Sequence, residues 1–334
     1  MQQHVERSGD DAGFLPREES PPQVSVFVPA LNEVDNIEPL LERIEQGFII
    51  SGVRGEVVLV DDGSTDGTGD VAEALRERYP WLRVLRHQRN QGLTEAMRTG
   101  FRAVRGEVVL FLPADLESHP DEDIPKLLDK LDEGYDAVAG WRQGRKGGKV
   151  FASAIYNAVC RWLFKLDIHD MNWIKGFRRE VIEALPPLRS DWHRFVLMIA
   201  ASQGWRVGEV PTQWYPRHSG RSHYGLSRIP LSFLDVLVVK FLVTFRRHPM
   251  RFFGSLGAIF IGIAVVLGVF LLYLYVTEGR QQRPIFQFGM NLAVAGLLLF
   301  LVGFVAELVV GQSERIDEMA RQIDELRRER SQDP

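Results

Sequence analysis

Acidic side chains follow three apolar segments of the sequence. These acids, each with the segment before it, are Glu33 after 24–28, Asp61 and Asp62 after 56–60, and Asp115 and Glu117 after 107–112. If such segments form parallel strands, the residues after them gather at one edge of the sheet, where ligands bind in open α/β folds. Carboxylates suit hydrogen bonds to a base and a ribose and, with a divalent cation between, coordination of a pyrophosphate. Since the sequence has no glycine-rich phosphate loop, the pattern predicts a nucleotide handled through a metal ion.

The segment from Asp61 to Thr68 also has an interpretation without a ligand. Asp, Gly and Ser are common in turns, and Ser64 or Asp66 could cap the helix that follows. For a single loop this turn chemistry is the simpler explanation. Three acidic strand ends at one sheet edge favour a binding site.

The elements that must position these acids alternate between strands and helices. Apolar segments predict strands at 24–28, 56–60, 82–85 and 107–112, and amphipathic spacing predicts helices at 38–48, 68–78 and 94–104. This order predicts an α/β fold with a mostly parallel, Rossmann-like sheet covered on both faces.

Two later segments, 252–277 and 284–306, contain no charged side chain. Each is long enough to cross a bilayer core of about 30 Å. Because only residues 278–283 separate them, they predict a transmembrane hairpin; two buried helices of a soluble core are the alternative. More arginines flank the pair than lie between its members, which places both ends in the cytoplasm. Glycines in both segments favour close helix packing, including packing between protomers of a homo-oligomer.

Composition suggests the remaining boundaries. We expect a disordered tail at 1–22, the α/β domain at 23–228, a juxtamembrane interfacial helix at 229–250, membrane helices at 251–277 and 284–310, and a charged helical cytoplasmic tail at 311–334. Asp235 and Lys240 interrupt the apolar segment before the hairpin, so a buried helix of the α/β domain is the alternative to an interfacial one.

Charge and cysteine content exclude several classes of function. The 40 Lys and Arg residues against 44 Asp and Glu give a net charge of -4, which argues against a nucleic-acid-binding surface. Cys160 is the only cysteine, so there is no internal disulfide framework.

The first residues lack a basic segment followed by an apolar one, which a secretory signal would have. We therefore expect the α/β domain to stay in the cytoplasm.

The motifs, taken in order, resemble those of family 2 glycosyltransferases with the GT-A fold. They are residues 28–33, 60–68, 90–92 with Ala96 and Gly100, and 114–116. Residues 176–178, 191–195 and 217–225, followed by two apolar spans, are similar to the polyisoprenyl-phosphate branch of that family. That branch includes dolichol-phosphate mannose synthase and bacterial undecaprenyl-phosphate glucosyltransferases.

This resemblance implies an enzyme of the cytoplasmic membrane, multi-pass, with its GT-A domain facing the cytoplasm. It would transfer one sugar, with inversion, from a UDP- or GDP-sugar to the phosphate of a polyprenyl phosphate. The nucleotide is assigned to Pro29, Leu31, Asn32, Glu33, Val60, Asp61, Asp62, Gly63 and Ser64.

The resemblance assigns Mg²⁺ or Mn²⁺ to Asp115 and Glu117. The family generally has Asp at the position of Pro113 and Gln at that of Glu117, so one carboxylate is lost and one is gained. Leu31 replaces a common aromatic residue, which removes a stacking partner for the base.

The acceptor phosphate is assigned to Arg142, Lys149, Ser153, Arg217 and Arg221. A phosphate monoester is already an anion at neutral pH and attacks without a strong base, so Asp191 either orients Arg194 or acts as a base. Asp115 and Arg217 would stabilise the charge that develops during transfer.

Two questions stay open. His193 is more simply a packed or hydrogen-bonded residue than an acid, a base or a metal ligand. Pro113 motivates a second functional hypothesis, a catalytically inactive relative that binds nucleotide sugar or polyprenyl phosphate as a membrane scaffold.

Overall fold

The structure, a computed structural model, describes residues 21–144, 161, 166–188, 192–216, 249–279 and 282–332. The chain divides into two compact units, Met1–Val236 and Leu237–Pro334, which are considered separately below. The predicted interfacial helix at 229–250 lies almost wholly outside the described residues.

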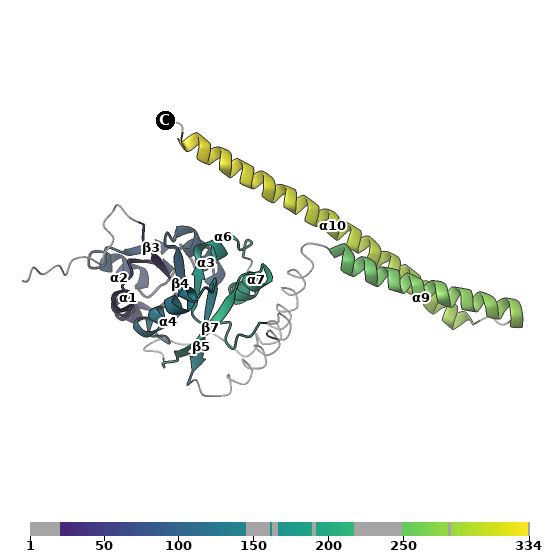
Figure 1. Ribbon diagram of the computed structural model, residues 1–334, viewed down its shortest axis with the longest axis horizontal. Coiled ribbons are helices and arrows are strands. Elements are labelled where there is room, and N and C mark those ends of the chain that lie inside the picture. Colours follow the sequence, from purple (N-terminus) through teal and green to yellow (C-terminus); the bar gives the residue numbers. More distant parts are fainter. Residues whose placement is uncertain are drawn as a thin grey trace, which may run out of the picture. The chain divides into compact units, whose positions relative to one another are not determined.

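The first unit is built around a seven-stranded sheet in the order β3-β2-β1-β4-β6-β5-β7 (Figure 1). Its strands are β1 (Val24–Ala30), β2 (Gly55–Asp61), β3 (Leu82–Arg86), β4 (Val108–Phe111), β5 (Ala137–Gln143), β6 (Lys175–Arg178) and β7 (Val207–Gln213). Its described helices are η1 (Val34–Asn36), α1 (Ile37–Ser51), α2 (Thr68–Leu75), α3 (Leu93–Ala103), α4 (Pro120–Asp132), α6 (Arg179–Glu183), η2 (Trp192–Phe195) and α7 (Val196–Ser202). The predicted α/β fold is confirmed.

Strand direction decides which residues meet at the ligand edge. β1 pairs in parallel with β2 and β4, β2 with β3, and β5 with β7, whereas β6 runs antiparallel to both β4 and β5. The carboxyl ends of all the parallel strands therefore lie at one edge. Because β6 is reversed, its first residue, Lys175, lies at that same edge.

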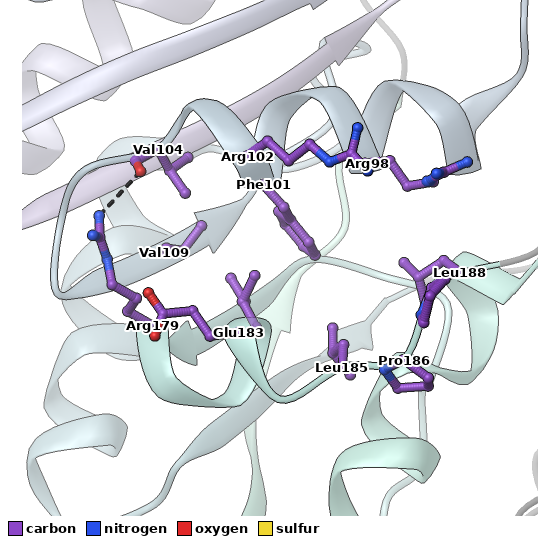
Figure 2. A pocket seen from close by; sticks show the side chains of 12 residues that line it. Arg98, Phe101, Arg102, Val104, Val109, Arg179, Glu183, Leu185, Pro186 and Leu188 are labelled. Atoms are coloured by element: carbon purple, nitrogen blue, oxygen red, sulfur yellow. Dashed lines mark hydrogen bonds between the residues drawn. The ribbon is translucent and has the colours of Figure 1, made fainter. Parts of the chain in front are cut away.

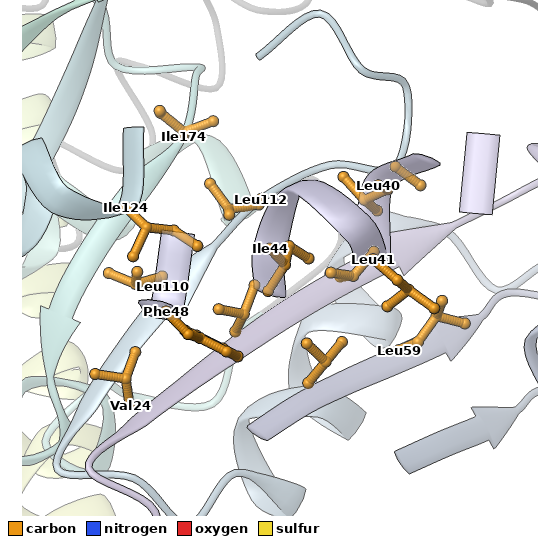
Figure 3. Packing of buried hydrophobic residues seen from close by; sticks show 14 of the residues in the cluster. Val24, Leu40, Leu41, Ile44, Phe48, Leu59, Leu110, Leu112, Ile124 and Ile174 are labelled. Atoms are coloured by element: carbon orange, nitrogen blue, oxygen red, sulfur yellow. The ribbon is translucent and has the colours of Figure 1, made fainter. Parts of the chain in front are cut away.

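The larger hydrophobic core lies between the sheet and α1, α2 and α4. Alternate residues of β1 (Val24, Val26 and Val28) belong to this core together with Leu40 and Ile44 of α1. Figure 3 shows Val24, Leu40 and Ile44 within the cluster. Alternation follows from the pleat, which points successive side chains to opposite faces. Core residues of β2 and β4 belong to the same layer, and α4 packs beside α1 and over β5, β6 and β7.

The opposite face of the sheet is aromatic and is covered by α3. Phe27 contacts Phe101 of α3 edge-on at 5.6 Å between ring centroids, and Phe101 contacts Phe177 of β6 at 6.1 Å. Gly100 allows this packing, because a Cβ there would lie 3.0 Å or less from the Phe27 ring. Helices on both faces explain why consecutive residues in the middle of β1 (26–28) and β2 (57–60) are apolar and buried.

The second unit contains two long helices, α9 (Pro249–Glu278) and α10 (Arg283–Gln332). The helical segments Pro249–Glu278 and Arg283–Gln312 are long and apolar enough to cross a membrane, and most of their large apolar side chains are exposed in the chain. That exposure suits lipid better than water. The predicted alternative of two buried helices is therefore not supported.

Glycines bring the two helices together within one chain. A Cβ at Gly257 of α9 would lie 2.6 Å from the carbonyl oxygen of Gly296 in α10, and one at Gly303 would lie 2.9 Å from Phe253. Gly262 and Gly268, by contrast, have open space around them. Close approach through small residues is a common way for membrane helices to pack. Gly257, Gly296 and Gly303 therefore lie where α9 and α10 contact each other within one hairpin.

Candidate active site

The loops after β1 and β2 are joined by hydrogen bonds. The backbone N–H of Asn32 donates to Ser64 Oγ at 2.9 Å, and the N–H of Thr65 donates back to Asn32 Oδ1 at 2.9 Å. The N–H of Glu33 donates to Thr68 Oγ1 at 2.9 Å. Asn32 has a φ of 57°, a left-handed conformation that asparagine tolerates. Asn32, Glu33 and Ser64, three of the sequence-predicted nucleotide residues, therefore belong to two loops that hydrogen bonds hold together.

Asp62 positions the loop between β3 and α3. Its carboxylate accepts hydrogen bonds from the backbone N–H of Gln91 at 2.9 Å and of Gly92 at 2.8 Å, and His87 Nδ1 lies 2.7 Å away. His87 Nε2 in turn lies 2.9 Å from Thr99 Oγ1 of α3. A predicted base-binding acid thus also fixes the entry to α3, a role for which the sequence offered no separate signal.

Asp61 and Gly63 have local structural roles. Asp61 is 1% exposed, accepts from the N–H of Ser64 at 2.9 Å, and lies 3.4 Å from the guanidinium of Arg86. Gly63 has a φ of 76°, and a Cβ there would lie 2.6 Å from Arg89 Cα and from the backbone nitrogen of Asn90. The turn interpretation therefore accounts for much of this loop, and Asp66 accepts from the N–H of Thr68 at 3.0 Å. Val60 is fully buried in β2, while Pro29 and Leu31 are partly exposed beside the loop.

A left-handed turn carries the acids after β4. Leu116 has a φ of 52° and is buried in the core, so its side chain anchors the turn. Asp115 and Glu117 flank Leu116, and the backbone N–H of Glu117 donates a hydrogen bond to Asp115 Oδ1 at 3.3 Å. The indole of Trp214, just after β7, donates to Glu117 Oε2 at 3.1 Å. Asn32 and Leu116 are the two described non-glycine residues with positive φ, and both lie at this sheet edge. Strained backbone is frequent at functional sites.

Two carboxylates at this position fit a hard divalent cation. Mg²⁺ and Mn²⁺ prefer oxygen ligands, and Mg²⁺ usually takes one or two protein carboxylates with substrate phosphates completing its coordination. Asp115 and Glu117 offer that donor set on one turn. Within the described ranges no group of three or more His, Cys, Asp or Glu side chains could enclose a metal without substrate oxygens.

Arg142, at the carboxyl end of β5, is already paired. Its Nε and Nη2 donate to the two carboxylate oxygens of Asp170 at 2.5 and 3.1 Å, and its guanidinium lies 4.7 Å from the centre of the Trp173 ring. Arg142 therefore lies at the predicted edge but is bound to a partner that the sequence analysis did not identify. Apart from Arg142 and Asp115, the predicted acceptor and catalytic residues lie outside the described residues: Lys149, Ser153, Asp191, Arg217 and Arg221.

Two buried basic side chains near this edge were not predicted as site residues. Lys175 is 3% exposed, and burial lowers its pKa to about 7. His193 is 9% exposed; burial, with smaller effects of Arg194 and Lys175, lowers its pKa to about 3, so the imidazole is neutral at pH 7. His193 Nδ1 lies 3.0 Å from Thr94 Oγ1 of α3. This contact agrees with the hydrogen-bonded interpretation of His193. A lysine inside the apolar segment 173–177 was the available signal for Lys175.

A pocket of about 460 Å³ lies between α3, β4 and α6 (Figure 2). Arginines and apolar side chains line it: Arg98, Phe101, Arg102, Val104, Val109, Arg179, Ile182, Glu183, Leu185, Pro186, Pro187 and Leu188. Arg179 is held there by hydrogen bonds to the carbonyl oxygens of Val104 and Gly106, both at 3.0 Å. No sequence-predicted site residue lines this pocket, so it does not belong to the site at the sheet edge.

Comparison with known proteins identifies the family. Residues 25–193 match the family described as Glycosyl transferase family 2, and the chain belongs to this family. A dodecaprenyl-phosphate galacturonate synthase of Rhizobium johnstonii is 31% identical over 308 residues, which cover 88% of this chain and 90% of the relative. An undecaprenyl-phosphate 4-deoxy-4-formamido-L-arabinose transferase of Edwardsiella ictaluri is 32% identical over 263 residues, covering 77% and 78%.

The fold has solved counterparts. Glucosyl-3-phosphoglycerate synthase of Mycobacterium tuberculosis, solved with Mn²⁺ and UDP-glucose, matches with a TM-score of 0.52 and 22% identity over 66% of this chain and 79% of that one. At this identity the likeness concerns the fold, and it confirms the predicted GT-A architecture. The chain is thus a glycosyltransferase by family and by fold.

Proposed function

We propose that this protein transfers one sugar from a nucleotide-sugar donor to the phosphate of a membrane polyprenyl phosphate. The observation that carries the proposal is the convergence of the loops after β1, β2 and β4 at one sheet edge, in a chain with a two-helix apolar hairpin. Relatives that act on dodecaprenyl and undecaprenyl phosphate align over more than three quarters of the chain, including part or all of the hairpin region.

The residues divide the work between binding the donor and stabilising charge. The connected loops of Asn32, Glu33 and Ser64 hold the base and ribose, and Asp62 keeps the neighbouring loop at residues 91–92 in place. The acceptor phosphate needs no deprotonation to attack the anomeric carbon. What it needs is alignment with the donor, which the cations Arg217 and Arg221 would supply.

A divalent cation, Mg²⁺ or Mn²⁺, would be held by Asp115 and Glu117. When bound, such an ion neutralises negative charge on the departing nucleoside diphosphate. The chain's own part is to present the two carboxylates on a fixed turn. The buried Leu116 and the hydrogen bond from Trp214 to Glu117 do this.

The test is direct. Membranes containing the full chain are incubated with polyprenyl phosphate and a panel of labelled UDP- and GDP-sugars, and lipid-linked product is extracted with solvent. Labelled lipid that appears only with both substrates supports the proposal. Nucleotide-sugar binding without product from any donor would instead support the inactive scaffold.

A further inference from the structure

A lysine is buried within the sheet at the site edge. Lys175 begins β6 and pairs with Phe111, the last residue of β4, four residues before Asp115. Its side chain is 3% exposed and lies over the Phe111 ring, with Nζ 5.0 Å from the ring centre. Lysine is almost never this buried without a charged partner.

The charges around Lys175 do not balance. Its Nζ donates one hydrogen bond, to the carbonyl oxygen of Trp173 at 2.7 Å, although an ammonium has three donors. The carboxylate that most affects it, Asp170, is held by both arms of Arg142. In its protonated form Lys175 thus shares the Asp170 carboxylate with Arg142, which leaves one positive charge in excess among the described residues. Because burial lowers the pKa of Lys175 to about 7, the ammonium and the neutral amine are both populated near neutral pH.

Neutral polar side chains also lie near Lys175. His193 is uncharged, is close enough for Lys175 to lower its pKa, and hydrogen-bonds Thr94 at the start of α3. The loop before α3 is the one that Asp62 holds. Along the sheet, Lys175 in β6 lies between β4, whose following turn carries Asp115, and β5, which carries Arg142. A donor bound across this edge, with its base on the loops after β1 and β2, would extend its sugar toward this region.

We infer that Lys175 is a specificity residue that receives the carboxylate of an acidic sugar, so that the donor is a nucleotide-linked uronic acid. The inference rests on the proposed function. A carboxylate carries one negative charge, so it matches the single excess charge of protonated Lys175 and would favour that form, whereas a phosphate monoester carries a charge of about -1.5 to -2. A sugar carboxylate also distinguishes the substrates named for the two relatives, since galacturonate has a carboxylate and 4-deoxy-4-formamido-L-arabinose has none.

The experiment compares donors that differ only at C6. The purified full chain is given polyprenyl phosphate, Mg²⁺ and either member of matched pairs: UDP-galacturonate and UDP-galactose, UDP-glucuronate and UDP-glucose, GDP-mannuronate and GDP-mannose. We expect one uronate to exceed its neutral partner in kcat/KM by about ten- to a hundredfold, the effect of one hydrogen bond to a charged group. Calorimetry with each donor in the absence of lipid should show the same preference in binding.

Variants assign that preference to Lys175. Lys175→Met should bring the uronate-to-neutral ratio close to one, and Lys175→Arg should keep part of it. Lys130→Met, at a partly exposed lysine of α4 paired with Glu133, should leave the ratio unchanged. Replacing a buried charge by an apolar chain of similar length usually preserves folding, which tryptophan fluorescence checks.

Two results would overturn the inference. One is a wild-type preference for the neutral sugar. The other is an equal loss with both donors in Lys175→Met, which would assign the lysine to a phosphate or to the fold. Failure to transfer any sugar to polyprenyl phosphate would instead refute the proposed function, so the two failures are distinguishable.

Discussion

Adjacent acids of the same type do different work in this protein. Asp61 is buried in its own turn and lies beside Arg86, whereas Asp62 holds the loop before α3. Asp115 follows a different strand and lies beside Glu117 on a turn anchored by Leu116. Mutations at these positions should therefore have different effects on the protein. Loss of Asp61 or Asp62 should disturb loop structure, while loss of Asp115 should affect charge stabilisation.

Asp115→Asn should lower turnover by at least about a hundredfold, because it removes a stabiliser of transition-state charge while keeping the shape of the side chain. Radiolabelled sugar transfer in Mg²⁺ or Mn²⁺ measures it. The matched control is Asp132→Asn, at an exposed acid at the end of α4, which should retain activity. Full wild-type activity in EDTA would contradict a metal held by Asp115 and Glu117.

Asp123 makes stability depend on pH. It is 1% exposed and burial raises its pKa to about 7; its nearest cation, Lys126, is 3.9 Å away. The folded state thus binds a proton more tightly than the unfolded state, so this contribution to stability is complete below pH 4 and is lost as pH rises through about 7. Relative to wild type, Asp123→Asn should be more stable at pH 8.5 than at pH 5.

Tryptophan fluorescence during thermal unfolding measures this effect in detergent. All seven tryptophans precede residue 215, so the signal comes from the first unit. The difference in Tm between Asp123→Asn and wild type should grow from pH 5 to pH 8.5, and Asp132→Asn should show no such growth. A difference that does not change with pH would mean that Asp123 is not protonated in the folded protein.

At the scale of elements, the reversal of β6 and the glycine contacts of α9 and α10 shape the two units. β6 inserts between β4 and β5 and brings Lys175 to an edge that otherwise holds strand carboxyl ends. In the hairpin, Gly257 and Gly296 let the backbones of two helices meet. Each feature depends on contacts between residues that are not neighbours in the sequence.

Gly257→Leu should destabilise the hairpin by about 1 to 3 kcal/mol, the usual cost of forcing extra atoms into a packed interface. Gly262→Leu in the same helix is the matched control, since a Cβ at Gly262 meets nothing within 4 Å in the chain. Heating in detergent followed by size-exclusion chromatography measures the monodisperse fraction that survives. If Gly262→Leu were the more damaging variant, the open face of α9 rather than the hairpin contact would be the important one.

For the whole molecule, we propose that both termini and the glycosyltransferase domain are cytoplasmic, with the turn between α9 and α10 outside. The flanking arginines support this orientation through the positive-inside rule. The acceptor phosphate would then meet the site from the cytoplasmic leaflet. The same arrangement gives the nucleotide sugar direct access from the cytoplasm.

Single cysteines test this topology in a background lacking Cys160. In spheroplasts, an impermeant maleimide should label Gln281→Cys, and should label Gln332→Cys only after the membrane is permeabilised. Each variant must retain sugar transfer to count. Labelling of Gln332→Cys in intact cells, with Gln281→Cys protected, would reverse the orientation.

The sequence by itself determined the alternation of strands and helices, the apolar hairpin, and the acids after β1, β2 and β4. These features can be predicted from local periodicity and composition, because both are properties of residues close together in the chain. The family followed from the order of its motifs. The GT-A architecture was predicted in the same way and is confirmed by the sheet.

Only the tertiary structure decided what each side chain does. It pairs Arg142 with Asp170, Glu117 with Trp214, and Asp62 with the loop before α3. These partners lie 28, 97 and about 30 residues apart in the chain. Neither the meeting of these partners nor the position of Lys175 at the ligand edge can be derived from local pattern, because both depend on strand order and on the reversal of β6. Burial and partner set the charge and availability of an ionisable group, and both are fixed when the sheet assembles.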